Sequence, residues 1–251
     1  MKNGHLSKKK QKQCDPENPA DDDCGDQWDH IAIAAESRLV VSMVPGKRTV
    51  ENTSKLIEDF VERTDGKSPA LITSDEYPPY TTVLKQVYGE EKAQQSTGKP
   101  GRPPKPQIIP SPDLVYATVH KEREKGRVVK VHQTLVFGTE EQLSAALSSS
   151  NVSSTINTSI VERYNGTDRC FNSRKVRSTY EFSKDLEVHE AASWFGITVY
   201  NFCRPNRSLA VKKGDSKCCE RTPAMAAGLA PQIYSISEIV GVQLFDDSRR
   251  E

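Results

Sequence analysis

The chain has 251 residues, a length that is enough for one large domain or two small ones. Hydrophobic residues make up 35% of it and charged residues 27%. Its 35 Lys and Arg residues and 34 Asp and Glu residues leave a net charge of +1, which excludes a simple polycation that coats DNA through bulk charge. No apolar run approaches the roughly 20 residues of a membrane span, and no hydrophobic signal segment follows the basic N-terminus.

The first 27 residues consist of blocks of like charge. Lysines dominate up to Lys12, and acidic residues follow from Asp15 onwards. Such blocks are typical of a solvated tail, so we expect residues 1–27 to form a charged tail. Cys14 and Cys24 lie in this segment, but two cysteines are too few for a metal site. Cys218 and Cys219 could supply the other two ligands only through a tertiary contact.

The next segment predicts strands and a helix. The apolar runs 30–34 and 39–44 favour a β-hairpin. Thr49 is a suitable N-cap for a helix that ends by Asp65 and Gly66. A short buried-type strand, 69–73, follows and runs into Asp75. The order strand, helix, strand from Leu39 to Thr73 suggests a parallel crossover.

A second helix or turn, 80–88, precedes a long interruption. Residues 98–106 are too rich in Pro and Gly for regular structure, so 89–137 is expected to be an insertion that carries a hairpin turning at Lys125 and Gly126. Helices are predicted from Thr139 and from Ser159, and the most apolar stretch is 186–202. The fold class is therefore α/β, a mixed sheet with flanking helices, and 204–251 is expected to be a loop-rich tail.

Two acidic residues stand where metal chemistry is possible. Asp75 follows a buried strand, at the sheet edge where functional groups gather in α/β proteins. Glu162 lies on a helix, next to the apolar pair Ile160 and Val161. Two such carboxylates can converge on Mg²⁺ and, with a second ion, support phosphodiester attack. The alternative is that Asp75 caps a turn and Glu162 is a solvated helix residue, and the pattern alone leaves both open.

An ordered series of motifs between Trp28 and Leu229 resembles the insertion-sequence transposases of the DDE type. Their fold is ribonuclease H-like and similar to that of retroviral integrases. The matching segments are Glu36–Val40, Gly46–Thr49, Ile72–Asp75 with Tyr80, Ser159–Asn165, Asp168 with Arg169, Arg174 with Lys175, Phe182–Lys184, Glu187–Glu190 and Arg221–Leu229.

The resemblance implies a catalytic domain over 28–203. Asp75 matches the second metal-binding acid of the family and Glu162 the third. The first acid lies on a strand before the hairpin, and no apolar strand with an Asp precedes Trp28. We therefore expect an N-terminally truncated transposase whose first strand is missing or incomplete and which is inactive as this chain. Mg²⁺ or Mn²⁺ would bind only if the site were completed, and the missing part could be encoded upstream.

Basic residues surround the predicted third acid. Within the resemblance we expect them to contact DNA phosphates, although a solvated surface is the alternative. They are Arg163, Arg169, Arg174, Lys175 and Arg177. In the Pro- and Gly-rich loop, Gly101, Arg102 and Pro103 resemble the core of a minor-groove hook, and the competing interpretation there is a rigid proline linker.

These observations leave two main hypotheses for function. The first is a transposase that cleaves and transfers DNA strands with a two-metal carboxylate site. The second is a non-enzymatic DNA-binding remnant that uses the basic surface and the Arg102 hook. A third, an unrelated α/β domain, predicts that Asp75 and Glu162 lie far apart. The expected partners are double-stranded DNA, at element ends and target, and further copies of the chain. The expected location is the cytoplasm, at the nucleoid.

Overall fold

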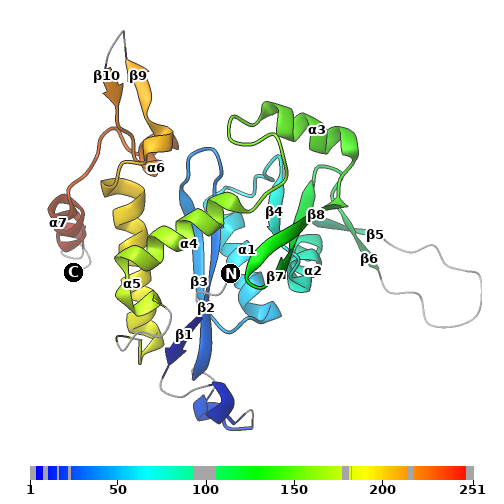
Figure 1. The fold of residues 1–251 in the computed structure, drawn as a ribbon, viewed down its shortest axis with the longest axis horizontal. Coiled ribbons are helices and arrows are strands. Elements are labelled where there is room, and N and C mark those ends of the chain that lie inside the picture. The colour runs from blue at the N-terminus through cyan, green and yellow to red at the C-terminus, as the bar shows by residue number, and fades with distance from the viewer. Residues whose placement is uncertain are drawn as a thin grey trace, which may run out of the picture. The chain divides into compact units, whose positions relative to one another are not determined.

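The structure is a computed structural model that describes residues 4–7, 11–15, 17–21, 24–92, 106–176, 181, 183–213 and 217–246 (Figure 1). It is a mixed α/β protein, which confirms the predicted class. Its described residues divide into two compact units. Unit 1 takes its residues from 1–47 and 160–251, and unit 2 takes them from 48–159. The ribonuclease H-like topology and the domain limits stay predictions.

The sheet of unit 1 is an antiparallel meander. Strands β1 (Gly4–Ser7), β2 (Gly25–Ile33) and β3 (Val40–Gly46) pair in that order. The β2–β3 hairpin is confirmed, and Arg38 in its turn has a positive φ of 61°. Ordered structure begins earlier than the charge pattern predicts, because β1, two 3₁₀ turns (Gln11–Gln13 and Pro19–Asp21) and the start of β2 lie within the expected tail.

Helices α4 (Ser159–Phe171) and α5 (Leu186–Thr198) provide the helical part of unit 1. Helix α5 continues into a π-helical turn, Val199–Cys203. A core cluster joins Val40 and Met43 of β3 to Tyr164 of α4 and Ile197 of α5. The buried Asn201 side chain also accepts a hydrogen bond from the Val40 amide (3.1 Å) and donates one to its carbonyl (2.9 Å). Residues far apart in the sequence therefore share one interior.

The rest of unit 1 consists of short elements. They are a 3₁₀ turn at Ser173–Lys175, another at Arg207–Leu209, the hairpin of β9 (Val211–Lys213) and β10 (Lys217–Cys219), α6 (Pro223–Ala226) and α7 (Ile236–Asp246). Most of these elements lie within 204–251, the segment that we expect to be loop-rich, and that expectation stays a prediction.

Unit 2 is built around β7 (Tyr116–Glu124). This strand pairs in parallel with β4 (Ile72–Asp75) and antiparallel with β8 (Arg127–Phe137). Residues in β7 and just before it alternate between two core clusters. Leu114 and Tyr116 pack with Ile57 of α1 (Val50–Arg63) and with α2 (Pro78–Val87), whereas Val115, Ala117 and Val119 pack with Leu143 of α3 (Glu140–Ser149). This alternation is the pleat of a strand that is covered on both faces.

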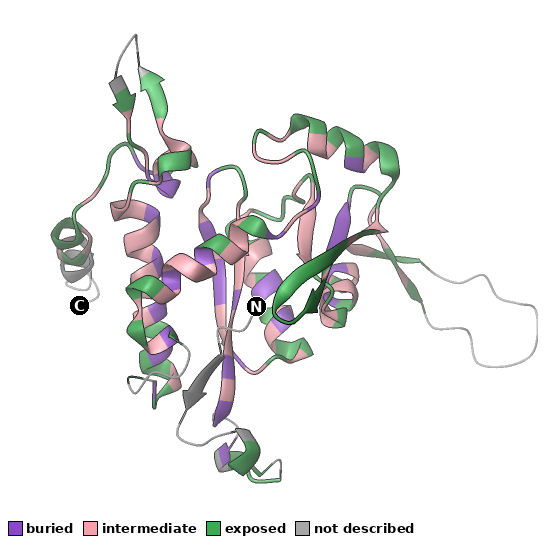
Figure 2. Ribbon diagram, viewed as in Figure 1, coloured by how far each residue is buried: buried purple, intermediate pink, exposed green. Residues whose placement is uncertain are grey.

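The hairpin of β7 and β8 lies within 89–137, the range that we expect to be an insertion, and that expectation stays a prediction. Because β7 hydrogen-bonds to β4, it is part of the sheet of unit 2, and β4, α2 and β7 form a parallel crossover. The predicted turn at Lys125 and Gly126 is confirmed, and both residues have positive φ, which suits a tight hairpin. Figure 2 shows the far end of this hairpin exposed.

Strands β5 (Gly89–Lys92) and β6 (Gln107–Pro110) pair antiparallel on either side of the Pro- and Gly-rich segment. Most of that segment, including Arg102 and its expected hook, lies outside the described residues. The crossover expected between 39 and 73 joins strands of different units, β3 and β4, and stays a prediction.

Candidate functional site

Asp75 is the last residue of β4, where the strand ends beside β7. Its side chain is 50% exposed, so the carboxylate is accessible at the surface of unit 2. Its Oδ2 atom lies 2.7 Å from Nη2 of Arg48, whose side chain is 36% exposed. The predicted acid therefore stands where the sequence places it, at a strand end, and it is paired with a cation that the sequence analysis did not single out.

Arg48 precedes Thr49, the N-cap of α1, and is held by Tyr77 as well as by Asp75. Its guanidinium carbon lies 4.0 Å from the centroid of the Tyr77 ring, which is the geometry of a cation–π contact. The Tyr77 hydroxyl donates a hydrogen bond of 2.8 Å to the Arg48 carbonyl oxygen. Tyr77 thus fixes both the backbone and the side chain of Arg48.

The surroundings of Asp75 are rich in hydroxyl groups. The Ser74 and Tyr116 hydroxyls lie 2.7 Å apart, and Tyr77 packs edge-on against Tyr80. Burial, together with the Asp75 carboxylate, raises the pKa of Tyr80 above its ordinary value, so this phenol stays neutral. The neighbouring acid, Glu76, pairs instead with His120: its carboxylate lies 2.8 Å from Nδ1 of that ring.

Glu162 lies in the first turn of α4 and is half-buried. Asp75 belongs to unit 2 and Glu162 to unit 1, so their convergence on a metal ion stays a prediction. Both are carboxylates, whose hard oxygens are the ligand type that Mg²⁺ and Mn²⁺ take. Within the described ranges, no three His, Cys, Asp or Glu side chains gather closely enough to hold a metal ion.

The predicted DNA-contacting residues fall into different environments. Arg163 is exposed on α4, and Arg169 and Arg174 are half-buried. Arg177 lies outside the described residues. Lys175 is 2% exposed, and its ammonium is enclosed by carboxylates. We therefore assign Lys175 to the interior of unit 1 and not to a DNA-contacting surface.

Lys175 is the centre of a buried ionic cluster, which we define as Asp29, Asp168, Lys175 and His189. The Lys175 ammonium lies 2.8 Å from a carboxylate oxygen of Asp29 on β2 and 2.8 Å from one of Asp168 on α4. Nε2 of His189 on α5 lies 2.9 Å from the other Asp29 oxygen. Burial by itself would lower the pKa of Lys175, but the two carboxylates outweigh it and raise that pKa.

The second ring nitrogen of His189, Nδ1, also has a partner. Nδ1 lies 3.0 Å from the buried Ser183 hydroxyl, so both nitrogens of the ring are engaged. The cluster thereby joins β2, α4 and α5 through charges that would each be costly to bury alone. Sequence reasoning missed it, because Asp29 lies just after the expected charged tail and stood out by no local pattern, and because Lys175 was assigned to the expected DNA contacts.

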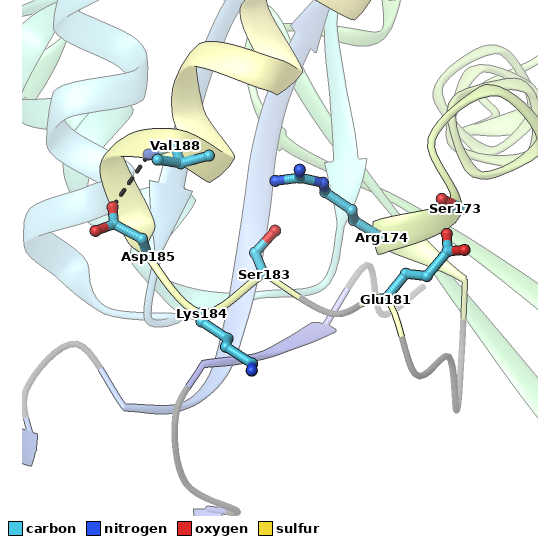
Figure 3. Close-up of a pocket in the computed structure, with 7 residues that line it drawn as sticks. All are labelled: Ser173, Arg174, Glu181, Ser183, Lys184, Asp185 and Val188. Carbon is cyan, nitrogen blue, oxygen red and sulfur yellow. Dashed lines mark hydrogen bonds between the residues drawn. The ribbon is translucent and has the colours of Figure 1, made fainter.

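A surface pocket adjoins Ser183. Charged side chains of both signs line it together with uncharged ones, as Figure 3 shows: Ser173, Arg174, Glu181, Ser183, Lys184, Asp185 and Val188. Asp185 is the N-cap of α5 and accepts a hydrogen bond of 3.1 Å from the Val188 amide. The lining therefore combines two cationic and two acidic side chains, and the acid at the helix start is used in capping.

Among the described helices, none combines the length and apolar character that crossing a bilayer requires. Comparisons of the chain with protein-family models, with curated proteins and with solved structures gave no match.

Proposed function

We propose that this chain is a DNA-handling protein of the DDE transposase type, in which Asp75 and Glu162 are two of the metal-binding carboxylates. The observation that carries the proposal is the place of Asp75, an accessible carboxylate at the end of a strand that pairs in parallel with its neighbour. Functional groups gather at this position in α/β sheets. The ordered motifs from Glu36 to Leu229 supply the reaction class.

In this proposal the two carboxylates would hold Mg²⁺ or Mn²⁺, which when bound supplies charge stabilisation for the attacking and leaving oxygens of a phosphodiester. Arg163, which is exposed one residue after Glu162, would hold a DNA phosphate near that position. Two matched acids in place of three predict weak metal binding, so this candidate predicts slow strand cleavage that needs a high concentration of Mg²⁺ or Mn²⁺.

The second candidate is DNA binding without cleavage. It is favoured by the ion pair between Asp75 and Arg48, because a carboxylate that is already neutralised at 2.7 Å is a poorer metal ligand. Both candidates share the DNA partner, and they differ in whether Asp75 and Glu162 are needed for anything beyond the fold.

One experiment separates the candidates. Labelled duplex DNA is incubated with the full chain and Mg²⁺ or Mn²⁺, and both cleavage and gel mobility are followed across a salt series. Cleavage that disappears in Glu162→Gln and Asp75→Asn but not in Glu190→Gln, an exposed acid on α5, supports the enzyme. A shift without cleavage, with a salt slope that falls by about one in Arg163→Ala, supports binding alone. Neither cleavage nor a shift would overturn both.

A further inference from the structure

Arg48 is a guanidinium that is fixed in place at Asp75, which distinguishes it from an ordinary surface cation. A long side chain on a surface normally loses rotamer freedom when it forms an ion pair, and this loss cancels much of the gain. Here the Tyr77 ring lies 4.0 Å from the guanidinium carbon, and the Tyr77 hydroxyl holds the Arg48 carbonyl at 2.8 Å. The guanidinium is thus already ordered beside the carboxylate.

This arrangement places two cations in competition for one ligand. A divalent ion that binds Asp75 needs a lone pair of its carboxylate, and Oδ2 is already in a bond of 2.7 Å to Arg48. The positive charge of Arg48 would also repel the ion at short range, with limited screening over a few ångströms. A divalent cation therefore has to displace the guanidinium or share the carboxylate with it.

We infer that Arg48 is a positioning residue that limits the access of divalent cations to Asp75, and that Tyr77 keeps it in that place. The inference rests on the proposed function, since it assumes that Asp75 is a metal ligand. It adds a regulatory feature to that site: metal affinity is set by how easily the guanidinium leaves the carboxylate. Anything that draws Arg48 away, such as a phosphate group, would then favour metal binding.

The test is the affinity of the full chain for Mn²⁺ alone, measured from the signal of free Mn²⁺ in electron paramagnetic resonance at low salt. Arg48→Gln keeps a similar shape and removes the charge. We expect it to bind Mn²⁺ about two- to fivefold more tightly than the parent chain, the range that corresponds to the loss of one exposed ion pair. Because exposed charges are screened, the difference should shrink as salt is added.

Arg63→Gln is the matched control. Arg63 pairs with Asp59 at 2.8 Å on the same unit, with comparable exposure, so its removal changes the net charge equally at a distant place. Tyr77→Leu, which removes the ring but not the charge, should tighten Mn²⁺ binding by less than Arg48→Gln does. Circular dichroism of each variant verifies that the fold is kept.

The outcomes separate this inference from the proposed function. Tighter Mn²⁺ binding in Arg48→Gln that is lost again when Asp75→Asn is added supports both. Unchanged or weaker binding in Arg48→Gln, with a site that still needs Asp75, overturns the role of Arg48 and leaves the proposed function standing. Mn²⁺ binding that does not depend on Asp75 in either background overturns both.

Discussion

Lys175 is a charged residue whose side chain is buried in the interior of unit 1. Its ammonium has no exposed surface and is compensated by Asp29 and Asp168, while His189 supports Asp29 from the other side. A buried charge of this kind is tolerated only when its partners are in place, and removal of one member leaves the others uncompensated. The buried ionic cluster therefore behaves as one unit.

We predict that Lys175→Ala destabilises the protein by about 3–5 kcal/mol, because it leaves two buried carboxylates without their cation. The free energy of unfolding in urea, read from circular dichroism, measures this. Lys184→Ala removes an exposed lysine of the same unit and should cost less than about 0.5 kcal/mol. A cost below about 1 kcal/mol for Lys175→Ala would contradict the described contacts.

The protein should lose stability at alkaline pH, because Tyr164 lies in the core of unit 1 beside the buried ionic cluster. Burial, and then the carboxylates of Asp168 and Asp29, raise the pKa of its phenol in the folded protein. The unfolded phenol titrates near a pKa of about 10. The stabilisation is therefore complete below pH 10 and is lost as the pH rises further, by up to about 1.4 kcal/mol per pH unit. The raised pKa of Lys175 acts in the same direction.

The measurement is the free energy of unfolding between pH 8 and pH 11.5. Tyr164→Phe has no proton to lose, so its profile should be flatter above pH 10 than that of the parent chain. Tyr234→Phe, at a half-buried ring in the C-terminal segment, serves as the comparison and should keep the parent profile. Identical slopes for all three proteins would contradict the role of Tyr164.

At the scale of elements, helix starts are fixed by local hydrogen bonds. Thr139 forms a capping box at α3, in which its hydroxyl accepts from the Gln142 amide at 3.3 Å and the Gln142 side chain accepts from the Thr139 amide at 2.9 Å. The Gln142 side chain also donates to the Pro112 carbonyl at 2.8 Å. One cap thus connects α3 to the segment that leads into β7.

We predict that Thr139→Ala lowers the free energy of unfolding by about 0.5–2 kcal/mol, because an amide at the helix start loses its acceptor. Thr139→Ser keeps the hydroxyl and should lie within about 0.5 kcal/mol of the parent chain. Urea unfolding measures both variants. Equal effects of Ala and Ser would show that the methyl group of Thr139, and not its cap, matters.

In the whole molecule, the two units differ in the number of chain segments that form them: unit 2 is one segment and unit 1 is two. Unit 2 is one continuous segment, 48–159, with its own hydrophobic clusters. Unit 1 needs both ends of the chain, because β3 is held by Asn201 and β2 by His189 and Lys175. Folding of unit 1 therefore requires contacts that close very long loops.

This difference predicts that a fragment of residues 48–159 unfolds cooperatively by itself, whereas neither 1–47 nor 160–251 does so alone. Mixing the two outer fragments should restore structure, because β2 and β3 of the first are held by side chains of the second. Circular dichroism and amide chemical-shift dispersion measure this. A fragment 48–159 without a cooperative transition would contradict the division into units.

Local sequence patterns were enough to predict the N-cap at Thr49, the helix start at Thr139, the turn at Lys125 and Gly126, and the position of Asp75 at a strand end. These depend on interactions within a few residues, so a pattern reports them directly. Three features became visible only in the folded chain: the burial of Lys175, the pairing of His189 with Asp29 160 positions away, and the ion pair between Arg48 and Asp75. The reason is that a charged side chain can be buried or fixed only where distant segments bring its counter-charge, and no local pattern records that meeting.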